Sequence, residues 1–268
     1  MEYRKITDIQ ELRHLQMDIL DEIHHFCMQH GITYFLSSGT LIGAVRHGGY
    51  IPWDDDIDIY MPRQSYERFI QEYKDDQGLY KLLEPRTVKH YFYTFAKLSD
   101  TRTRMVEAWY DNFPIGINID IFPVDYVTDN MRLRRFIFWF KKNLFRIYID
   151  KQVRLLRDRH PYHILKRLLC KALPLPAHTI NAWLRSIAFH KRPTQTVCNM
   201  TETGPSITGC FSAQAIASSV DICFEGKTYK TMAGYEEYLK KTYGDYMKLP
   251  PEDQRQHHLF EAYIQTME

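Results

Sequence analysis

The chain of 268 residues is 44% apolar and 25% charged, a composition typical of a globular protein, and 14% aromatic content argues against disorder. No apolar run approaches the roughly 18 residues that span a bilayer, and the first residues lack the apolar core of a signal peptide. We therefore expect a cytoplasmic protein. The five cysteines form no C-x-x-C pair, which favours buried thiols, although Cys198, Cys210 and Cys223 could meet in space.

The net charge of +2 conceals a strong separation of charge along the chain. Residues 132–192 hold 16 Lys/Arg and two Asp/Glu, whereas the rest of the chain holds 19 basic and 31 acidic residues. Such asymmetry predicts two working surfaces, one that binds cations and one that faces an anionic partner.

The hydrophobic pattern of the first half predicts alternating helices and strands. Apolar residues three and four apart indicate a helix over 8–30, with Asp8 as its cap, Glu11 completing a capping box and Gly31 as its end. A strand over 33–36, a turn over 37–40, a helix over 41–46 and a loop over 47–55 should follow. We then expect a half-buried strand over 56–60, a helix from Pro62 to Tyr73, and strands at 79–83, 90–98, 104–107 and 117–122.

The second half reads mainly as helices separated by prolines, at 131–158, 162–173 and 178–190. Short strands and loops should fill 196–233, with a helix over 234–243 and a final short helix in the tail. We predict an α+β fold in three parts: a catalytic core over 1–130, a basic helical region over 131–193, and a segment over 194–268 that packs back on the core.

Four carboxylates lie within the five residues from Asp54 to Asp58. On a strand, Asp56 and Asp58 project to one side while Ile57 and Ile59 enter the core. Two neighbouring carboxylates repel each other unless a cation lies between them, and Mg²⁺ commonly takes one or two carboxylates plus substrate phosphates. The pattern predicts a metal on Asp56 and Asp58. A solvated acidic loop is the alternative, weakened because the acids interrupt an apolar strand pattern.

Two further features support a site that handles phosphate. Ser38, Gly39 and Thr40 lie between a strand and a helix, where small residues let the backbone approach a phosphate and the helix N-terminus favours an anion. Asp120 lies on a second alternating strand and would face the same way as the acidic pair if the two strands are neighbours. It could complete the metal site or remove a proton from an attacking hydroxyl.

These three elements resemble the nucleotidyltransferase fold. More closely, residues 39–47 (GTLIGAVRH) and 49–58 (GYIPWDDDID) are similar to the signature of the LicD family of cholinephosphotransferases. Further matches are AKLSD at 96–100, IDIFPVD at 119–125, FEGK at 224–227, and residues 243–251 with His257 and His258. The resemblance implies a nucleotidyltransferase-like mixed sheet flanked by helices, with a basic, mostly helical insertion and a short C-terminal segment.

The resemblance also implies an activity: transfer of phosphocholine from CDP-choline to a glycan hydroxyl, with release of CMP. Mg²⁺, or alternatively Mn²⁺, would be held by the catalytic residues Asp56, Asp58 and Asp120. The substrate-binding candidates share proximity to this motif or a match to the family, and they are Ser38, Gly39, Thr40, Arg46, Lys97, Tyr50, Trp53 and His258. Arg46 and Lys97 would clamp phosphate, and aromatic rings would contact choline. Surface ion pairs and core packing are the alternative roles.

Several alternatives remain open. The donor could carry ribitol, glycerol or ethanolamine, the enzyme could be a true nucleotidyltransferase, or the chain could be a non-catalytic nucleotide- or glycan-binding relative. The acceptor implied is a cell-surface glycan such as lipopolysaccharide, teichoic acid or capsule, or its polyprenyl-linked precursor.

The basic helical region carries an apolar stripe flanked by Arg and Lys, formed by Phe136, Trp139, Phe140, Leu144, Ile147 and Tyr148. This stripe could meet an anionic membrane at the inner face of the cell membrane, or it could face the protein core beneath a basic outer face. We expect no nucleic-acid partner.

Overall fold

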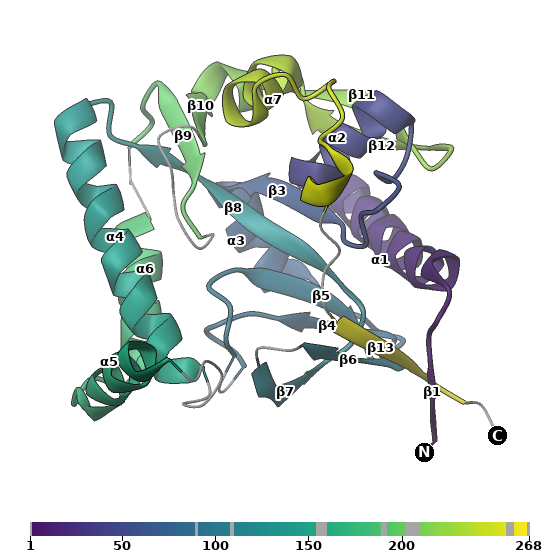
Figure 1. The fold of residues 1–268 in the computed structure, drawn as a ribbon. Coiled ribbons are helices and arrows are strands. Elements are labelled where there is room, and N and C mark those ends of the chain that lie inside the picture. The colour runs from purple at the N-terminus through teal and green to yellow at the C-terminus, as the bar shows by residue number, and fades with distance from the viewer. Residues whose placement is uncertain are drawn as a thin grey trace.

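The computed structural model describes residues 2–88, 91–107, 110–153, 160–188, 192–201, 209–255 and 260–266. These residues form an α+β fold, as predicted, in which helices surround a mixed central sheet (Figure 1). The predicted substrate residue His258 lies outside the described residues.

Strand β8 (Asn118–Val127) organises the central seven-stranded sheet. It runs parallel to β3 (Asp58–Pro62), and it pairs antiparallel with β5 (Ala96–Asp100) through its first half and with β9 (Thr196–Asn199) through its second half. The outer pairs are β2 (Phe35–Leu36) with β3, β4 (Tyr80–Leu83) with β5, and β10 (Cys210–Ser212) with β9. Residues 196–212 therefore extend a sheet that begins in the first half of the chain.

Helices α1 (Ile9–His30) and α3 (Arg63–Glu72) contact the central strands. The Asp8 side chain accepts a hydrogen bond from the Gln10 amide, and Gly31 ends α1 in the left-handed conformation, so both predicted boundaries are confirmed. The capping box is not formed, because Glu11 pairs with Arg4 instead.

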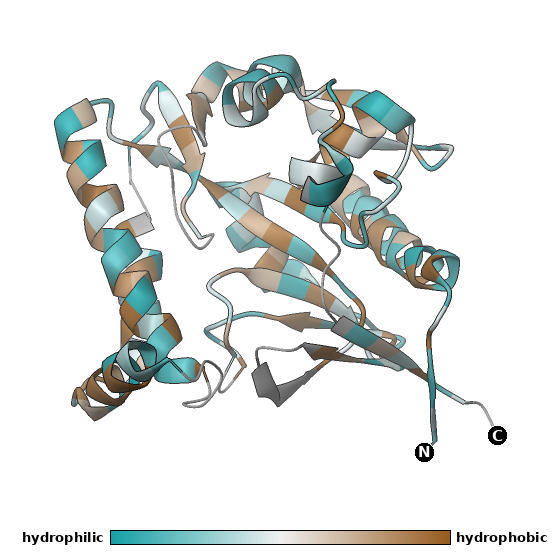
Figure 2. Ribbon diagram, in the orientation of Figure 1, coloured by the Kyte–Doolittle hydropathy of each residue, from teal (hydrophilic) through white to brown (hydrophobic). Residues whose placement is uncertain are grey.

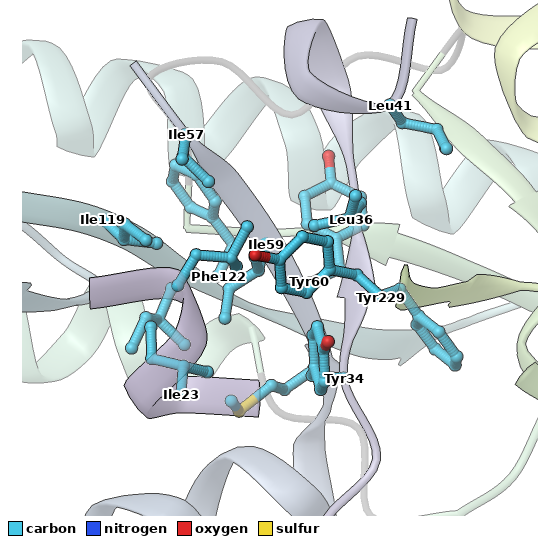
Figure 3. Packing of buried hydrophobic residues seen from close by; sticks show 14 of the residues in the cluster. Ile23, Tyr34, Leu36, Leu41, Ile57, Ile59, Tyr60, Ile119, Phe122 and Tyr229 are labelled. Atoms are coloured by element: carbon cyan, nitrogen blue, oxygen red, sulfur yellow. The ribbon is translucent and has the colours of Figure 1, made fainter. Parts of the chain in front are cut away.

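The core lies between these helices and the sheet and is shown in Figure 3. Ile59 on β3 and Ile119 on β8 are completely buried, and Ile57 nearly so, whereas Asp58 and Asp120 between them are partly exposed. The period-two pattern of the sequence thus reports which side of the sheet each residue faces. Burial of these branched side chains, each worth roughly 1.5–3 kcal/mol, fixes the register in which the acids are presented.

Some predicted boundaries are wrong. Helix α2 (Ser38–His47) begins at Ser38, so most of the predicted turn over 37–40 is its first helical turn. Strand β3 begins at Asp58 rather than Asp56, and β5 occupies only the end of the strand predicted at 90–98. The short strand β7 (Tyr110–Ile115) was not expected.

The short helix predicted in the tail is present only as a three-residue 3-10 helix, η2 (Glu252–Gln254). The tail then forms strand β13 (Phe260–Gln265), which was not expected and lies between β1 (Tyr3–Lys5) and β6 (Thr103–Glu107). The three residues of β1 are all exposed and show no apolar alternation, so no pattern in the sequence could mark this strand. Pairing between distant segments, rather than local propensity, creates this small sheet.

Before the tail, residues 219–243 form a hairpin and a helix that pack against α2 and the edge of the central sheet. Strands β11 (Ser219–Phe224) and β12 (Lys227–Met232) form a hairpin, and α7 (Tyr235–Tyr243) follows it. The hairpin contacts α2 and β2, and α7 contacts β10. The Tyr238 hydroxyl accepts a hydrogen bond from the Ser38 amide (3.3 Å), which ties α7 to the start of α2.

Three helices form a separate layer beside the sheet, at the left of Figure 1: α4 (Met131–Gln152), α5 (Pro161–Ala172) and α6 (Ala177–Ala188). Helices α4 and α6 pack through a small cluster formed by Leu144, Tyr148, Ile180 and Leu184. The Tyr148 hydroxyl donates to the Phe92 carbonyl (2.6 Å) and so joins this layer to the segment that leads into β5. None of the helices described is long and apolar enough to cross a membrane.

Candidate active site

Asp58 and Asp120 lie side by side at the starts of two parallel strands. They are direct partners in the register of β3 and β8, and their apolar neighbours Ile59 and Ile119 both enter the core. We predicted that Asp120 would join the acidic pair if its strand lay beside theirs, and β8 does lie beside β3. The Asp120 amide also donates to the Ile57 carbonyl (3.1 Å), which extends the parallel pairing upstream toward Asp56.

The turn into α2 holds the backbone of Asp58 from both sides. The Asp58 amide donates to Thr40 Oγ1 (2.8 Å), and the Asp58 carbonyl accepts from the Ser37 amide (3.1 Å). Thr40 is buried. The hydroxyl that we predicted to bind phosphate therefore positions the catalytic strand in this structure, and the helix N-terminus and the acids form one unit.

Gly39 lets a carboxylate approach this helix N-terminus closely. A Cβ at Gly39 would lie 2.6 Å from Asp54 Oδ2, a distance that only hydrogen in place of a side chain permits. Asp54 was not predicted as a site residue, yet it is the carboxylate next to the positive end of α2. The sequence signal for it was present in the run of four acids.

Two side chains of α1 hold the acidic loop from below. Arg13 Nη2 donates to the Asp54 carbonyl (2.7 Å) and to the carbonyls of Ile51 and Pro52 (3.1 Å each), and Gln16 Nε2 donates to the Asp55 carbonyl (2.8 Å). Our sequence reasoning missed both residues. The available signal was a polar residue, Gln16, on the apolar face of a helix, where it is buried.

Lys97 contributes a cation to the carboxylate pair. It lies opposite Asp120 on β5, and its ammonium forms an ion pair with Asp120 and a hydrogen bond with Asn118 Oδ1 (3.1 Å). The ammonium also lies 4.3 Å from the centre of the Tyr93 ring. Lys97 is buried. We predicted it as a phosphate clamp; here its ammonium neutralises part of the charge of Asp120.

Arg46 makes contacts that its predicted role did not anticipate. Its guanidinium donates to the Tyr246 carbonyl (2.8 Å) and to His47 Nε2 (2.9 Å), so it joins α2 to the segment after α7. Partial burial of the guanidinium lowers the pKa of Arg46. Binding of a phosphate by Arg46 would require these bonds to be exchanged.

The two aromatic candidates occupy different surroundings. Tyr50 is buried: its hydroxyl donates to Gln16 Oε1 (3.0 Å), and the Arg13 guanidinium lies 4.6 Å from the ring centre. Burial raises the pKa of Tyr50 well above its ordinary value. Trp53 is partly buried, and the Arg255 guanidinium stacks 4.6 Å from its ring centre. Arg13 covers the Tyr50 ring and Arg255 covers the Trp53 ring, so a ligand would have to displace an arginine to stack on either aromatic side chain.

The oxygen donors at this site suit a hard divalent cation. Among the residues described, no three His, Cys, Asp or Glu side chains lie close enough together to hold a metal, so Asp56, Asp58 and Asp120 do not form a complete protein cage. Mg²⁺ usually keeps several waters and binds through one or two carboxylates plus substrate phosphates. The partly exposed pair of Asp58 and Asp120 fits that mode of binding.

Comparison with known proteins assigns this arrangement to a class. Residues 31–157 match the family model described as LicD/FKTN/FKRP, nucleotidyltransferase domain. The matched range contains α2, the acidic loop, β3, Lys97 and Asp120. The fold and the site thus define a phosphotransferase built on a nucleotidyltransferase-like core.

Individual relatives narrow the class further. The chain is 33% identical to the lipopolysaccharide cholinephosphotransferase LicD of Haemophilus influenzae, over 97% of this chain and 99% of that protein. It is 42% identical to an uncharacterised protein of Rickettsia typhi over 20% of this chain and 17% of the relative. It is 55% identical to human ribitol 5-phosphate transferase FKRP over 29 residues, 11% of this chain and 6% of FKRP. The chain belongs to the LicD family.

Proposed function

We propose that this enzyme transfers phosphocholine from CDP-choline to a hydroxyl group of a cell-surface glycan, or of its polyprenyl-linked precursor, and releases CMP. The observation that carries the chemistry is the pairing of Asp58 with Asp120 on adjacent parallel strands, next to the N-terminus of α2. The choice of choline draws support from the Haemophilus relative, a lipopolysaccharide cholinephosphotransferase that this chain matches over almost its full length.

The hydroxyl oxygen of the acceptor would attack the phosphorus that carries choline, and the bond from that phosphorus to the bridging oxygen would break, so that CMP leaves. Bound Mg²⁺ or Mn²⁺ would neutralise charge on the diphosphate, and Asp58 and Asp120 would hold it. Asp56 would accept the hydroxyl proton, because Asp120 would be engaged by the metal and by Lys97. Hydrogen bonds with Thr40 and Ser37 hold the Asp58 backbone in place. The ion pair with Lys97 holds the Asp120 carboxylate.

A second donor deserves a direct test because of one observation. The short segment shared with FKRP is 55% identical, and that relative transfers ribitol 5-phosphate. The same carboxylates would serve CDP-ribitol, CDP-glycerol or CDP-ethanolamine, since all these donors present a diphosphate. A true nucleotidyltransferase would use the same acids but leave the nucleotide on the acceptor.

The test is to incubate the enzyme with CDP-choline, Mg²⁺ and a glycan acceptor and to measure both CMP and acceptor-bound choline. We expect equal amounts of the two products, which Asp58→Asn abolishes while Glu72→Gln, an exposed acid on α3, does not. If the enzyme released CMP from CDP-ribitol but not from CDP-choline, the proposed active site would stand and the choice of CDP-choline as donor would be wrong. Nucleotide bound to the acceptor would overturn the reaction.

A polyprenyl-linked acceptor would bring the active site to the inner face of the cell membrane. The enzyme would then be cytoplasmic and peripheral, with no nucleic-acid partner. If the enzyme contacts the membrane, we expect the helical layer formed by α4, α5 and α6 to make that contact.

A further inference from the structure

Helix α4 buries the apolar side chains of Phe138, Leu144 and Tyr148, but apolar and charged residues are not cleanly separated between its two sides. Two of the side chains that it buries against the rest of the molecule are cationic, Arg134 and Lys141. Its first half exposes large aromatic residues instead: Phe136 is 60% exposed and Trp139 is 62% exposed, and Phe140 is exposed as well. A helix that only covered a core would show the reverse.

The orientation of α4 is fixed by polar contacts on its inner side. Arg134 Nε donates to the Thr128 carbonyl (2.7 Å) and its Nη2 donates to Thr196 Oγ1 (3.0 Å). Rotating the helix to bury Trp139 would break both bonds and the packing of Leu144 and Tyr148 against α6. The outward aromatic face is therefore a stable property of the fold.

Helix α5 also exposes large apolar side chains while it buries a cation. Arg167 and Cys170 are buried, whereas Tyr162, Leu165 and Leu169 are exposed, Leu169 by 62%. The three exposed residues follow an i, i+3, i+7 spacing and so lie on one face. Of the exposed large apolar side chains in the described residues, more than half belong to α4–α6 and the residue that follows α5, although these helices are a minor part of the chain.

Basic residues accompany the aromatic face of α4. Arg135, Trp139, Lys142 and Arg146 are exposed and follow an i, i+4, i+7, i+11 spacing, so they form one row. Leu133, Phe136 and Phe140 form the neighbouring row. A row of cations beside a row of Leu and Phe, with Trp between them, is the pattern of helices that lie in a membrane interface.

We propose that the exposed face of α4, with that of α5, is a docking surface for an anionic lipid bilayer. The aromatic and leucine side chains would enter the headgroup region, and Arg135, Lys142 and Arg146 would contact lipid phosphates. The charge is complementary, because Arg135, Lys142 and Arg146 on this face of α4 are all cationic and exposed. The purpose rests on the proposed function, because docking brings the active site to a lipid-linked acceptor.

Two other occupants fit less well. A second copy of this chain would place two basic rows against each other across a symmetric interface, where like charges repel. A nucleic acid would meet the cations but leave the leucine and phenylalanine side chains in water. A bilayer satisfies both rows at once.

The test is co-sedimentation of the full chain with vesicles, without donor or acceptor. We expect binding to vesicles of equal parts phosphatidylcholine and phosphatidylglycerol, little binding to phosphatidylcholine alone, and weaker binding at high salt. Arg135→Gln, Lys142→Gln and Arg146→Gln together should weaken partition roughly a hundredfold, about fivefold for each cation. Trp139→Ser should weaken it about tenfold.

Met28→Ser is the matched control, because Met28 on α1 is 53% exposed but lies outside the docking surface; this variant should bind vesicles like the native chain. All variants should release CMP with a water-soluble acceptor, so failure of docking and failure of the proposed activity are distinguishable. The proposal is overturned if the native chain ignores anionic vesicles. It is also overturned if Trp139→Ser abolishes a dimer seen by sedimentation, or if an oligonucleotide binds where vesicles do not.

Discussion

The central sheet separates its apolar and charged side chains cleanly, whereas the helical layer does not. In the sheet, Ile59 and Ile119 are buried while Asp58 and Asp120 reach the surface. In the layer, Trp139 is exposed while cations lie inside. Figure 2 shows hydrophobic and hydrophilic residues interleaved along α4. Burial of apolar residues accounts for the pattern of the sheet. It does not account for the exposed aromatic face of α4, which includes Phe136, Trp139 and Phe140.

The cations inside the layer are not equivalent. Arg134 satisfies its guanidinium with two hydrogen bonds. Lys141 is buried near Asp125, but that carboxylate already holds Arg63 through two bonds of 2.7 and 2.6 Å, and the Lys141 ammonium has no hydrogen-bond partner in the part of the chain described. Burial of the Lys141 ammonium should therefore lower the free energy of unfolding of the protein.

The largest expected effect is on catalysis, at Asp58 on strand β3. We expect Asp58→Asn to lower kcat by about 10³-fold or more, equivalent to about 4 kcal/mol, because it removes a carboxylate that we propose as a ligand of the metal. The free energy of unfolding should change by less than about 1 kcal/mol, since the side chain is partly exposed. Steady-state CMP release and urea unfolding measure the two effects, and undiminished CMP release would remove Asp58 from the site.

A paired substitution compares the two regions directly. Ile59→Ala should lower the free energy of unfolding by about 3 kcal/mol, because it opens a cavity in a packed core. Trp139→Ala, a larger truncation, should change it by less than about 0.5 kcal/mol, because the indole is mostly in water. Urea unfolding of both variants gives the values. A large loss for Trp139→Ala would show that this face is part of the packed structure and not a free surface.

The sequence predicted the sheet better than the layer for a physical reason. Alternation along 56–60 and 118–121 marks both burial and function, because acids that interrupt a buried strand must face a common side. Thr40 was predicted from the turn of small residues before a helix, and Lys97 from the resemblance to the LicD family. Neither inference could give their contacts, since the bond from Thr40 to Asp58 and the ion pair from Lys97 to Asp120 depend on which strands become neighbours.

Other failures share a different cause. The stripe that we read along α4 mixes exposed Phe136 with buried Tyr148, because helical spacing identifies a face but not whether protein or another partner covers it. Tyr50 looked like a ligand contact because it is close in sequence to the acids, yet Arg13 and Gln16 from a distant helix enclose it. Long-range packing decides such cases.

The next prediction concerns Lys141. Burial lowers its pKa from 10.5 to about 7. Below pH 7 the ammonium is charged in both the folded and unfolded chains, and its burial cost is fully present; between pH 7 and 10.5 only the folded chain loses the proton, so stability rises with pH. Lys141→Met should therefore raise the free energy of unfolding by about 2 kcal/mol at pH 7, and its advantage should shrink as the pH rises.

Urea unfolding of the native chain and Lys141→Met near pH 7 and near pH 9 checks this window. The difference between the two proteins isolates the lysine, because other titrating groups contribute equally to both. Lys142→Met, its exposed neighbour on α4, is the control and should show no such pH dependence. An advantage that grew with pH would mean that a carboxylate, rather than burial, sets the pKa of Lys141.

The smallest expected effect tests how the helix N-terminus and the acids act as one unit. Thr40→Val keeps the shape of the side chain but leaves the Asp58 amide without its acceptor, and we expect a loss of about 1 kcal/mol in the free energy of unfolding. Because the same bond positions the Asp58 carboxylate, kcat should fall about tenfold, roughly the equivalent of 1.4 kcal/mol, with little change in KM. Thr40→Ser retains the hydroxyl and should keep both values near those of the native chain. If Thr40→Val instead raised KM and left kcat unchanged, the hydroxyl would contact the donor phosphate, and its hydrogen bond to Asp58 would be secondary to substrate binding.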